Sequence, residues 1–440
     1  MSGDVVRAIH DAGVVGAGGA GFPTHVKTSA KVDCVIINGA ECEPLLRVDQ
    51  QLMRDMPRNL LKGLSMLLDA VGAKRGVIAL KKKYTVAIEQ LSSCITDPRI
   101  EIFKLDDFYP AGDEQVMVRE VTGKSIPEAG IPLQVDCIVS NVETVLNVAA
   151  SLEGQPVTDT WLTVTGRVTE PFTCQAPIGT SKREILAQAG VQKQEGLALI
   201  EGGPMMGKLV EDWDTPVTKT TKGLIVVPED HPLVTARKAP LEVYLRQARS
   251  VCMGCARCTE MCPRNLLGHN LQPHLIMRAM AYGKADSQAI KSSLLCCECG
   301  VCEYACPMRL SPRWVNTSLK GQLVAAGIRY QGDGTEPEAA KSRDERKIPV
   351  KRLISRLALK EYDKPAPVKE LANKPKKVTI LLRQHIGVPC QPVVEVGDLV
   401  ERGQLIGEIP EGKLGARVHA SIDGVVLEQN VAQVVIQALD

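Results

Sequence analysis

Hydrophobic residues in the first part of the chain alternate between the spacing of helices and that of buried strands. Residues 60–73, LLKGLSMLLDAVGA, place apolar side chains at helical spacing and have a glycine near the end, which predicts an amphipathic helix. Residues 32–41, VDCVIINGAE, predict a buried strand that runs into a polar turn, and RGVIALKKK predicts a second strand. This alternation predicts an α/β domain over residues 1–155.

The pattern changes several times after residue 155. Residues 156–215 contain short strand-like runs around one helical stretch, SKREILAQAG, which predicts a small α/β module. Residues 240–330 form a cysteine-rich module, and residues 331–375 are charged and proline-containing, which is typical of a linker with one helical patch. Residues 376–440 return to short strands with glycine turns. We therefore expect a multidomain protein with α/β and α+β parts.

Composition narrows the classes of function. The chain has 440 residues, a net charge of +2 and 3% aromatic residues, so neither a basic surface nor a base-stacking platform for nucleic acid is expected. No apolar run approaches the ~20 residues of a membrane helix, and no signal peptide is recognisable, so we expect a cytoplasmic protein without a membrane span. Fifteen cysteines in a reducing compartment indicate metal or redox chemistry.

Two cysteine runs are the strongest chemical signal. CMGCARCTEMCP and CCECGVCEYACP both have the C-x2-C-x2-C-x3-C-P spacing of bacterial ferredoxins, in which the fourth cysteine binds the other cluster. Two [4Fe-4S] clusters are therefore expected, and they form a short path for single electrons. The ligands assigned to the first are Cys252, Cys255, Cys258 and Cys306, and those assigned to the second are Cys296, Cys299, Cys302 and Cys262.

Zinc knuckles are the alternative, but zinc sites usually use two separated C-x2-C pairs. Cys297 falls outside the spacing and is expected to be a neighbour rather than a ligand. The scattered cysteines are expected to be small buried hydrophobic residues, and they are Cys34, Cys42, Cys94, Cys137, Cys174 and Cys390. His25 is expected to be a loop residue, and His269 and His274 are expected on the surface.

Residues 13–27, GVVGAGGAGFPTHVK, form a loop with almost no side chains. Gly16, Gly18 and Gly21 satisfy G-x-G-x-x-G, and Glu41 stands about twenty residues further on. The Rossmann fingerprint must follow a strand, however, and here the residues before the loop have helical spacing. We therefore reject a Rossmann site, and the loop by itself is also compatible with a tight structural turn.

The loop is followed by three further motifs in a fixed order. GAGGAGFPTHVK, NGAECEP, YPAGDEQVM and NVET together resemble the flavin-binding subunit of respiratory complex I and its relatives. In that family the glycine loop lets the backbone approach FMN, and NADH stacks on the same flavin. The resemblance therefore implies FMN as a cofactor and NADH as electron donor, without a separate Rossmann domain.

The resemblance also implies roles for individual residues. Gly16, Gly18 and Lys27 would meet the phosphate and ribityl side of FMN. The remaining flavin residues implied by the resemblance are Asn38 and Glu41 at the ring edge, Tyr109, Gly112 and Glu114 along the pocket, and Asn141 and Thr144 at the phosphate end. Phe22 would stack on NADH, and Glu43 would accept hydrogen bonds from its ribose.

The chain departs from the complex I pattern at four positions. It has Ala17 where that family has arginine, Ala40 in place of an acid, Cys42 in place of serine and Asp113 in place of glutamate. Because these polar groups are missing, the nucleotide contacts that the complex I family makes through them are not expected in this chain. No general acid or base is expected, since the redox cofactors carry the chemistry.

The order of the modules points to a closer family. The small module resembles the soluble-ligand-binding β-grasp (SLBB) type, and residues 385–426 resemble a barrel-sandwich module. The RnfC subunit of the ion-pumping NADH:ferredoxin complex carries that module before its glycine loop, whereas here it stands at the C-terminus. This order is similar to the cobalamin reductases of the propanediol-utilisation microcompartment. The tail also resembles lipoyl domains, with Lys413 in a hairpin, but the residues that flank a carrier lysine are missing.

This resemblance implies an NADH-dependent oxidoreductase that reduces cob(III)alamin to cob(II)alamin or cob(I)alamin for coenzyme B12 recycling in propanediol degradation. A flavin fits this role because it can accept an electron pair and release single electrons. Implied partners are cobalamin as substrate, a cobalamin adenosyltransferase and shell proteins, with a location in or on a microcompartment. The alternative is an RnfC-like subunit that passes electrons from NADH to ferredoxin within a membrane complex.

Overall fold

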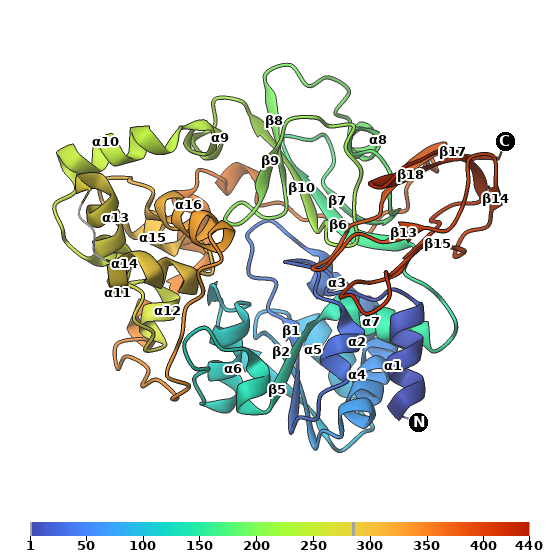
Figure 1. The fold of residues 1–440 in the computed structure, drawn as a ribbon, viewed down its shortest axis with the longest axis horizontal. Coiled ribbons are helices and arrows are strands. Elements are labelled where there is room, and N and C mark those ends of the chain that lie inside the picture. Colours follow the sequence, from blue (N-terminus) through green and yellow to red (C-terminus); the bar gives the residue numbers. More distant parts are fainter. Residues whose placement is uncertain (1, 284–286, 440) are drawn as a thin grey trace.

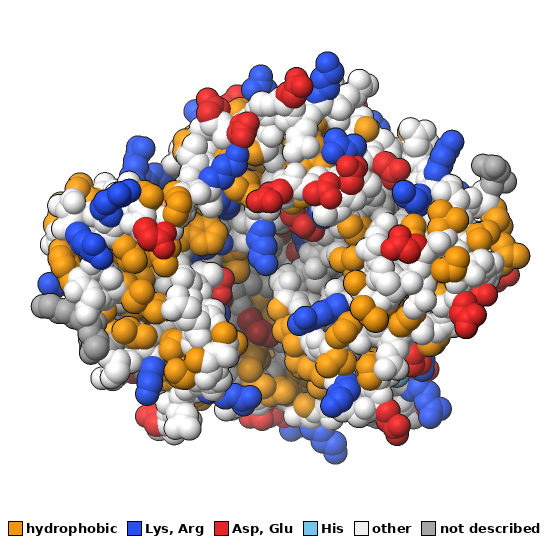
Figure 2. Space-filling view, turned by 45° about the horizontal axis from the view of Figure 1, so that its top comes forward, with side chains coloured by type: hydrophobic (Ala, Val, Ile, Leu, Met, Phe, Trp, Pro, Cys, Tyr) orange, Lys and Arg blue, Asp and Glu red, His pale blue; other side chains and the backbone are white. Residues whose placement is uncertain are grey.

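The computed structural model describes residues 2–283 and 287–439, and Figure 1 shows how four regions of the chain are arranged. The first 150 residues lie at the bottom of the view, and the β-rich region that follows lies above them. The cysteine-rich region lies to the left, and the C-terminal strands lie to the right, next to the N-terminal helices. Figure 2 shows that this face of the molecule is hollowed at its centre, with acidic and basic side chains along the hollow.

A four-stranded parallel sheet forms the centre of the first region, with the strand order β3-β2-β1-β5. Its strands are β1 (Cys34–Gly39), β2 (Arg75–Lys81), β3 (Ile100–Leu105) and β5 (Cys137–Asn141). Ile36 packs on one face of the sheet, whereas Val35 and Ile37 pack on the other. Because both faces are buried, the strands read as continuous apolar runs, as parallel strands commonly do.

Helices cover both faces of this sheet. Those of the first face are α1 (Ser2–Asp11), α3 (Val48–Asp55), α4 (Pro57–Val71), α5 (Thr85–Cys94) and α7 (Val142–Ser151), and α6 (Glu114–Thr122) covers the second. The helix predicted over residues 60–73 is confirmed as α4. It begins with Pro57 at its first turn and ends at Gly72, which has φ 69°. The α/β prediction for this region is confirmed.

The β-rich region is a five-stranded mixed sheet with the strand order β7-β6-β10-β8-β9. Its elements are β6 (Asp159–Gly166), β7 (Phe172–Pro177), α8 (Lys182–Gln188), β8 (Leu197–Glu201), β9 (Lys208–Val210) and β10 (Gly223–Pro228). The helix packs on the sheet through Ile185 and Leu186. β10 lies at the centre of the sheet, so the module extends past residue 215, where the sequence placed its end.

The cysteine-rich region is built from short helices. They are α9 (Pro232–Lys238), α10 (Leu241–Val251), α11 (Arg257–Glu260), α12 (Pro263–Leu266), α13 (Pro273–Tyr282), α14 (Ser287–Ser292), α15 (Val301–Ala305) and α16 (Pro312–Ala325). Its apolar cluster includes Ile276, Met277, Val315 and the buried Cys262. The core therefore forms directly around the cysteine runs.

The charged segment 331–375 packs against the rest of the chain. It contains η3 (Asp344–Arg346), β11 (Ile348–Pro349), α17 (Val350–Arg356) and η4 (Lys360–Tyr362). β11 pairs with β4 (Phe108–Tyr109) of the first region, and Leu353 is fully buried. The apolar positions of the helical patch thus attach the segment that its composition had described as a linker.

Two small sheets form the C-terminal region. One has the order β12-β18-β17-β14, from β12 (Lys377–Leu381), β14 (Leu399–Val400), β17 (Gly424–Gln429) and β18 (Gln433–Ala438). The other has the order β13-β15-β16, from β13 (Gln391–Pro392), β15 (Leu405–Glu408) and β16 (Val418–His419). Their buried side chains continue the cluster of α1 and α4, whereas Lys413 lies exposed in a turn. Within residues 2–283 and 287–439, no helix has the length and apolar character needed to cross a membrane.

Candidate redox site

The carboxyl ends of β1 and β5 meet at the point where the strand order of the parallel sheet reverses. β2 and β3 continue the sheet on one side of β1, whereas β5 is added on the other side. Open α/β sheets bind ligands at such switch points. Asn38 lies at the end of β1, and Asn141 at the end of β5, directly opposite in register. The fold therefore brings both ends of the expected FMN site to the same edge.

Asn141 and Thr144 hold the backbone of the glycine loop. Thr144 Oγ1 accepts a hydrogen bond from the Ala17 N–H at 2.8 Å, and Asn141 Nδ2 donates to the Ala17 carbonyl at 2.8 Å. The next residues, Gly18 and Gly19, have φ of 95° and 61°, which favours glycine. A Cβ at Gly19 would meet no atom within 4 Å, so the backbone here is open to a ligand.

Two other glycines of the loop make room for protein instead. A Cβ at Gly13 would lie 2.2 Å from the Arg417 carbonyl oxygen, and one at Gly21 would lie 2.9 Å from Thr220 Cγ2. These neighbours belong to the C-terminal region and to the loop 218–222 of the β-rich region. The bareness of the glycine loop thus has two causes, close packing at its ends and an open backbone in its middle.

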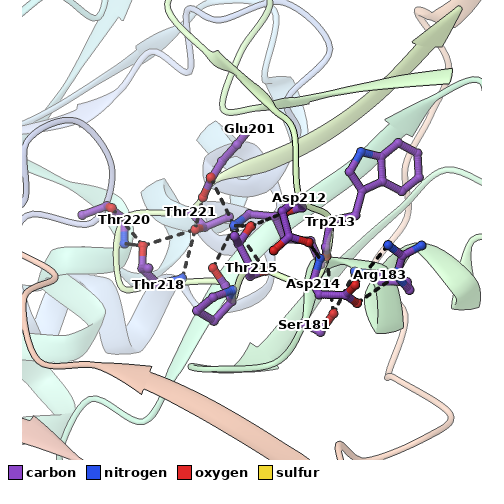
Figure 3. Close-up of polar contacts among 12 residues, drawn as sticks. Ser181, Arg183, Glu201, Asp212, Trp213, Asp214, Thr215, Thr218, Thr220 and Thr221 are labelled. Atoms are coloured by element: carbon purple, nitrogen blue, oxygen red, sulfur yellow. Dashed lines mark hydrogen bonds and ion pairs between the residues drawn. The ribbon is translucent and has the colours of Figure 1, made fainter. Parts of the chain in front are cut away.

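The segment 212–221 has a shape fixed by polar contacts, which Figure 3 shows. Thr221 Oγ1 donates a hydrogen bond to Glu201 at 2.5 Å, and the Thr218 N–H donates to Thr221 Oγ1 at 3.0 Å. Arg183 donates two hydrogen bonds to Asp214, at 2.8 and 3.1 Å. The segment is therefore held in one conformation where it meets the glycine loop.

Lys219 joins three regions of the chain. Its Nζ donates hydrogen bonds to the carbonyl oxygens of Gly13 and Arg417, both at 2.7 Å. The residue is 3% exposed, and this burial lowers the pKa of Lys219 to about 8. The two carbonyl contacts offset part of the cost of burying its ammonium group.

Lys222 lies over Gly18 and forms an ion pair with Glu143, whose side chain is 3% exposed. Burial lowers the pKa of Lys222, although the carboxylates of Asp49 and Glu41 act in the opposite direction. Burial and the nearby Glu41 raise the pKa of Asp49. One cation therefore serves three carboxylates beside the glycine loop. Lys222 stands in no local sequence motif, because its partner Glu143 lies in a different region of the chain.

Asn38 and Glu41 both support loops at the site. Asn38 Nδ2 donates to the Gly112 carbonyl at 2.8 Å, which joins two expected pocket residues. The carboxylate of Glu41 accepts hydrogen bonds from the Asp49 N–H and from Gln50 Nε2, both at 2.8 Å. Glu41 therefore holds the start of α3 as well as lying at the expected flavin edge.

Lys27, Glu114 and Phe22 lie together. Lys27 Nζ is 3.6 Å from the Glu114 carboxylate, donates to the Val139 carbonyl at 3.2 Å, and lies 5.9 Å from the centre of the Phe22 ring. The Gly16 N–H donates to the Phe22 carbonyl at 2.9 Å, which closes the glycine loop. The structure thus joins the expected phosphate-side lysine to the aromatic residue expected to receive NADH.

Glu43 has different partners from Phe22, although the resemblance assigns both to NADH. Its carboxylate accepts hydrogen bonds from the N–H groups of Met205 and Met206, at 2.8 and 3.1 Å, and lies 3.3 Å from the Tyr109 hydroxyl oxygen. Burial raises the pKa of Glu43, and the Met205 N–H opposes this shift. Glu43 therefore attaches the first region to the β-rich region.

Asp113 lies at the start of α6 and faces the cysteine-rich region. Its carboxylate accepts hydrogen bonds from the N–H groups of Gln115 and Val116 and forms a two-bond ion pair with Arg264, at 2.6 and 2.9 Å. Burial acts to raise the pKa of Asp113, but the Arg264 guanidinium and the N–H groups of Val116 and Gln115 together outweigh it, so the pKa is lowered. The departure from glutamate at this position thus fits a buried, ionised partner for Arg264, which the sequence analysis missed.

Four cysteines that the sequence assigned to one cluster line one cavity; they are Cys262, Cys296, Cys299 and Cys302. The non-ligand neighbour Cys297 lines the same cavity. The Glu298 N–H donates to Cys296 Sγ at 3.3 Å, a contact that also occurs in iron–sulfur sites. The set in this cavity, which we call the inner set, fits a cluster with buried thiolates.

The other assigned set also gathers in space. Burial raises the pKa of Cys258 to about 12, and the neighbouring thiols of Cys306, Cys255 and Cys252 contribute to the same shift. Cys255 is exposed, in contrast to every member of the inner set. We call these four cysteines the outer set.

The backbone follows the same course in both cysteine runs. Gly254 and Ala256 have φ of 66° and 56°, and Glu298 and Gly300, at the same positions of the second run, have φ of 61° and 76°. Such backbone forms concave N–H nests, which bind anionic groups and occur in iron–sulfur sites. The backbone of both runs therefore suits the expected clusters.

Two histidine expectations are wrong, those for His269 and His25. His269 is 2% exposed, and its Nε2 donates a hydrogen bond to the Ile126 carbonyl at 2.9 Å. The reason is that the turn after α12 packs against the first region. His274 is partly buried and contacts Thr259 Oγ1 at 2.7 Å. His25, expected in a loop, lies in the short helix α2 (Thr24–Thr28) that follows the glycines, edge-on to His10.

Three family models match parts of the chain. Residues 9–150 match the Nuo51 FMN-binding domain, residues 251–311 match a 4Fe-4S dicluster domain, and residues 353–438 match the RnfC barrel sandwich hybrid domain. These matches confirm the expected flavin domain, iron–sulfur module and C-terminal barrel-sandwich module. FMN and [4Fe-4S] clusters are therefore the cofactors that this architecture holds.

Curated relatives match nearly the whole chain. The chain is 47% identical to "Cobalamin reductase PduS" of Citrobacter freundii, over 96% of this chain and 93% of the relative. It is also 47% identical to the protein of the same name from Salmonella typhimurium, over 97% and 95%. One component of the Na(+)-translocating ferredoxin:NAD(+) oxidoreductase complex of Acetobacterium woodii is 34% identical, over 62% of this chain and 60% of that component. The chain therefore belongs to the PduS family of cobalamin reductases.

Proposed function

We propose that this protein is an NADH-dependent cobalamin reductase, a flavin and iron–sulfur oxidoreductase that reduces cob(III)alamin to cob(II)alamin or cob(I)alamin. The observation that carries this proposal is the identity of 47%, over 96% and 97% of the chain, with two proteins named cobalamin reductase. The relative from an ion-translocating complex is more distant and matches only 62% of the chain. A role in a membrane complex is therefore the weaker candidate.

The site residues serve binding, orientation and exclusion of water. Bound FMN and iron–sulfur clusters would supply the change from two-electron hydride to the single electrons that cobalt accepts. Asn141 and Thr144 hold the glycine loop at the phosphate end, and Asn38 holds the loop of Gly112 at the other end. Members of the inner set such as Cys302, 7% exposed, lie away from solvent.

The assignments of individual flavin, NADH and cluster ligands belong to the same proposal, as does the presence of two clusters. So do the partners, a cobalamin adenosyltransferase and microcompartment shell proteins, and a location in or on the microcompartment. The family resemblance supports these points. Co-purification of the tagged chain with shell proteins from a propanediol-grown culture tests the location.

The experiment that tests the activity is anaerobic. The chain is reconstituted with iron, sulfide and FMN, NADH is added, and hydroxocobalamin is followed by its visible spectrum. We expect cob(II)alamin to appear, and to be absent when FMN is omitted. Cys94→Ser, outside every contact described for the site, is the matched control and should match the unmodified chain.

Two results would contradict the proposal. One is NADH reduction of the flavin and clusters while cobalamin stays oxidised and added ferredoxin is reduced, which favours the membrane-complex role. The other is cobalamin reduction that proceeds equally well without FMN.

A further inference from the structure

The loop 109–113 of the first region is attached at both ends to the cysteine-rich region. At one end, the Tyr109 hydroxyl donates a hydrogen bond to the Cys299 carbonyl oxygen at 2.7 Å, and Tyr109 is 1% exposed. At the other end, Asp113 forms its two-bond ion pair with Arg264, and these side chains are 12% and 9% exposed. Both contacts are shielded from water, so each fixes its end of the loop.

The middle of the same loop contacts the expected flavin pocket. The Gly112 carbonyl accepts the hydrogen bond from Asn38, at the end of β1. A Cβ at Gly112 would lie 3.1 Å from Cys42 Sγ and 3.3 Å from Asn38 Oδ1. The loop therefore packs tightly against the switch point of the sheet, where even a methyl group would crowd it.

Both attachments lead to the inner set. Cys299 is a member of that set, and Arg264 follows its member Cys262 by two residues. The outer set, by contrast, includes the exposed Cys255. One five-residue loop thus spans from the flavin pocket to the inner set, and the outer set lies nearer to solvent.

We propose that Tyr109 and Arg264 are positioning residues that hold the inner set against the flavin pocket, so that the inner set is the entry for electrons and the outer set the exit. This rests on the proposed function. Each transfer oxidises the reduced flavin by one electron and reduces one iron–sulfur centre by one, so two transfers account for one NADH. Since electron transfer slows steeply with distance, loosening the loop slows this step.

The test uses the reconstituted full chain without cobalamin. Stopped-flow absorbance after mixing with NADH separates flavin bleaching from the later reduction of iron–sulfur centres, which rapid-freeze EPR identifies. Tyr109→Phe should slow the second phase about tenfold, because small misplacements of reacting groups have effects of that order or larger. The iron content should stay unchanged, and the rates of both phases are taken per bound flavin.

Arg264 needs a paired change, because its loss alone leaves Asp113 as a buried unpaired charge. The double variant Asp113→Asn with Arg264→Met leaves no such charge and should slow the second phase about as much as Tyr109→Phe does. The single variant Arg264→Lys keeps a cation beside Asp113, so its second phase should be faster than that of the double variant. Tyr282→Phe is the matched control, since Tyr282 also donates to a backbone carbonyl, that of Arg249, but within the cysteine-rich region. It should leave both phases unchanged.

The order of the two sets is tested by removing one ligand from each. In Cys255→Ser, NADH should still reduce the inner iron–sulfur centre. In Cys299→Ser, NADH should bleach the flavin while the outer centre stays oxidised, although dithionite reduces it. The reverse pattern would overturn the order, and second-phase rates within twofold of the unmodified chain would overturn the positioning role.

These outcomes are separate from failure of the proposed function. If the unmodified chain did not reduce cobalamin, the proposed substrate would be wrong. The transfer from flavin to the inner set would still be measurable, because the assay contains no cobalamin.

Discussion

Replacing Lys222 with methionine tests the ionic contact beside the glycine loop. Methionine keeps an unbranched apolar stem over Gly18 but removes the ammonium group that pairs with Glu143. Three carboxylates, those of Glu143, Glu41 and Asp49, then lack their shared cation. Repulsion among them should open the loop that Asn141 and Thr144 hold.

The magnitude follows from burial. Glu143 is 3% exposed and Lys222 14% exposed, and removing one partner of a buried pair costs about 3–5 kcal/mol. Proton uptake by Asp49, whose pKa is already raised, relieves part of this cost, so we expect the lower end, about 3 kcal/mol. If the FMN-binding form carries the whole cost, the FMN dissociation constant rises roughly 100-fold.

The assay is FMN titration by fluorescence quenching, together with the thermal unfolding midpoint. The double variant Lys222→Met with Glu143→Gln should recover more than about 1 kcal/mol, because the buried carboxylate of Glu143 is no longer left without its cation and the amide oxygen of the introduced glutamine can still accept from the Trp161 N–H. Lys238→Met breaks the exposed Lys238–Glu229 pair and should leave both the FMN affinity and the unfolding midpoint nearly unchanged. An FMN affinity within about twofold of the unmodified chain, or strict additivity in the double variant, would refute the reasoning.

Three further predictions concern packing, pH and iron. Gly13→Ala should lower the thermal unfolding midpoint far more than Gly19→Ala. Both glycines have positive φ, but only a Cβ at Gly13 would meet a backbone oxygen, at 2.2 Å. Equal shifts of the midpoint would contradict this prediction. Burial, and after it the nearby cations, lower the pKa of His419 to about 3. As the pH falls below 6.5, the unfolded chain therefore binds a proton at His419 before the folded chain does, and the folded state loses stability. At pH 5 this amounts to about 2 kcal/mol, and His419→Gln should show a shallower loss in pH-dependent unfolding; an unchanged slope would count against it. Cys302→Ser should lose about half of the bound iron in a colorimetric assay, because it removes a cluster ligand, whereas Cys297→Ser should keep all of it. Iron loss from Cys297→Ser but not from Cys302→Ser would make Cys297 the ligand and Cys302 the neighbour.

Local patterns were enough to predict several parts of the molecule. The helix α4 follows from apolar spacing, with a proline at its start and a glycine after its end, and these are properties of neighbouring residues. The backbone geometry of the two cysteine runs is also local. Each run has two residues with positive φ at the same positions, and one of the two is a glycine. The grouping of Cys262 with the second run came from the family spacing, and the cavity places these four together.

Composition was a poorer guide for the segment 331–375. Its charges and prolines are typical of a linker, yet Leu353 is fully buried and β11 pairs with β4. A few apolar residues at helical spacing are enough to bury one face of a short helix, and the average composition of a segment does not reveal such residues. His269 was misplaced for a similar reason, because its burial depends on a distant surface.

The sequence by itself determined the cofactor chemistry, since the spacing of the cysteines, the order of the four motifs and the helix and strand periodicity are all local. Only the tertiary structure decided which regions meet. The pair of Asp113 and Arg264 joins residues 151 positions apart, and Glu43 reaches Met205 across 162 positions. Nothing in a local pattern specifies such partners, because each charge could be satisfied by water or by many other groups. Packing of the four regions selects one partner for each, and in doing so places the cysteine sets relative to the flavin pocket.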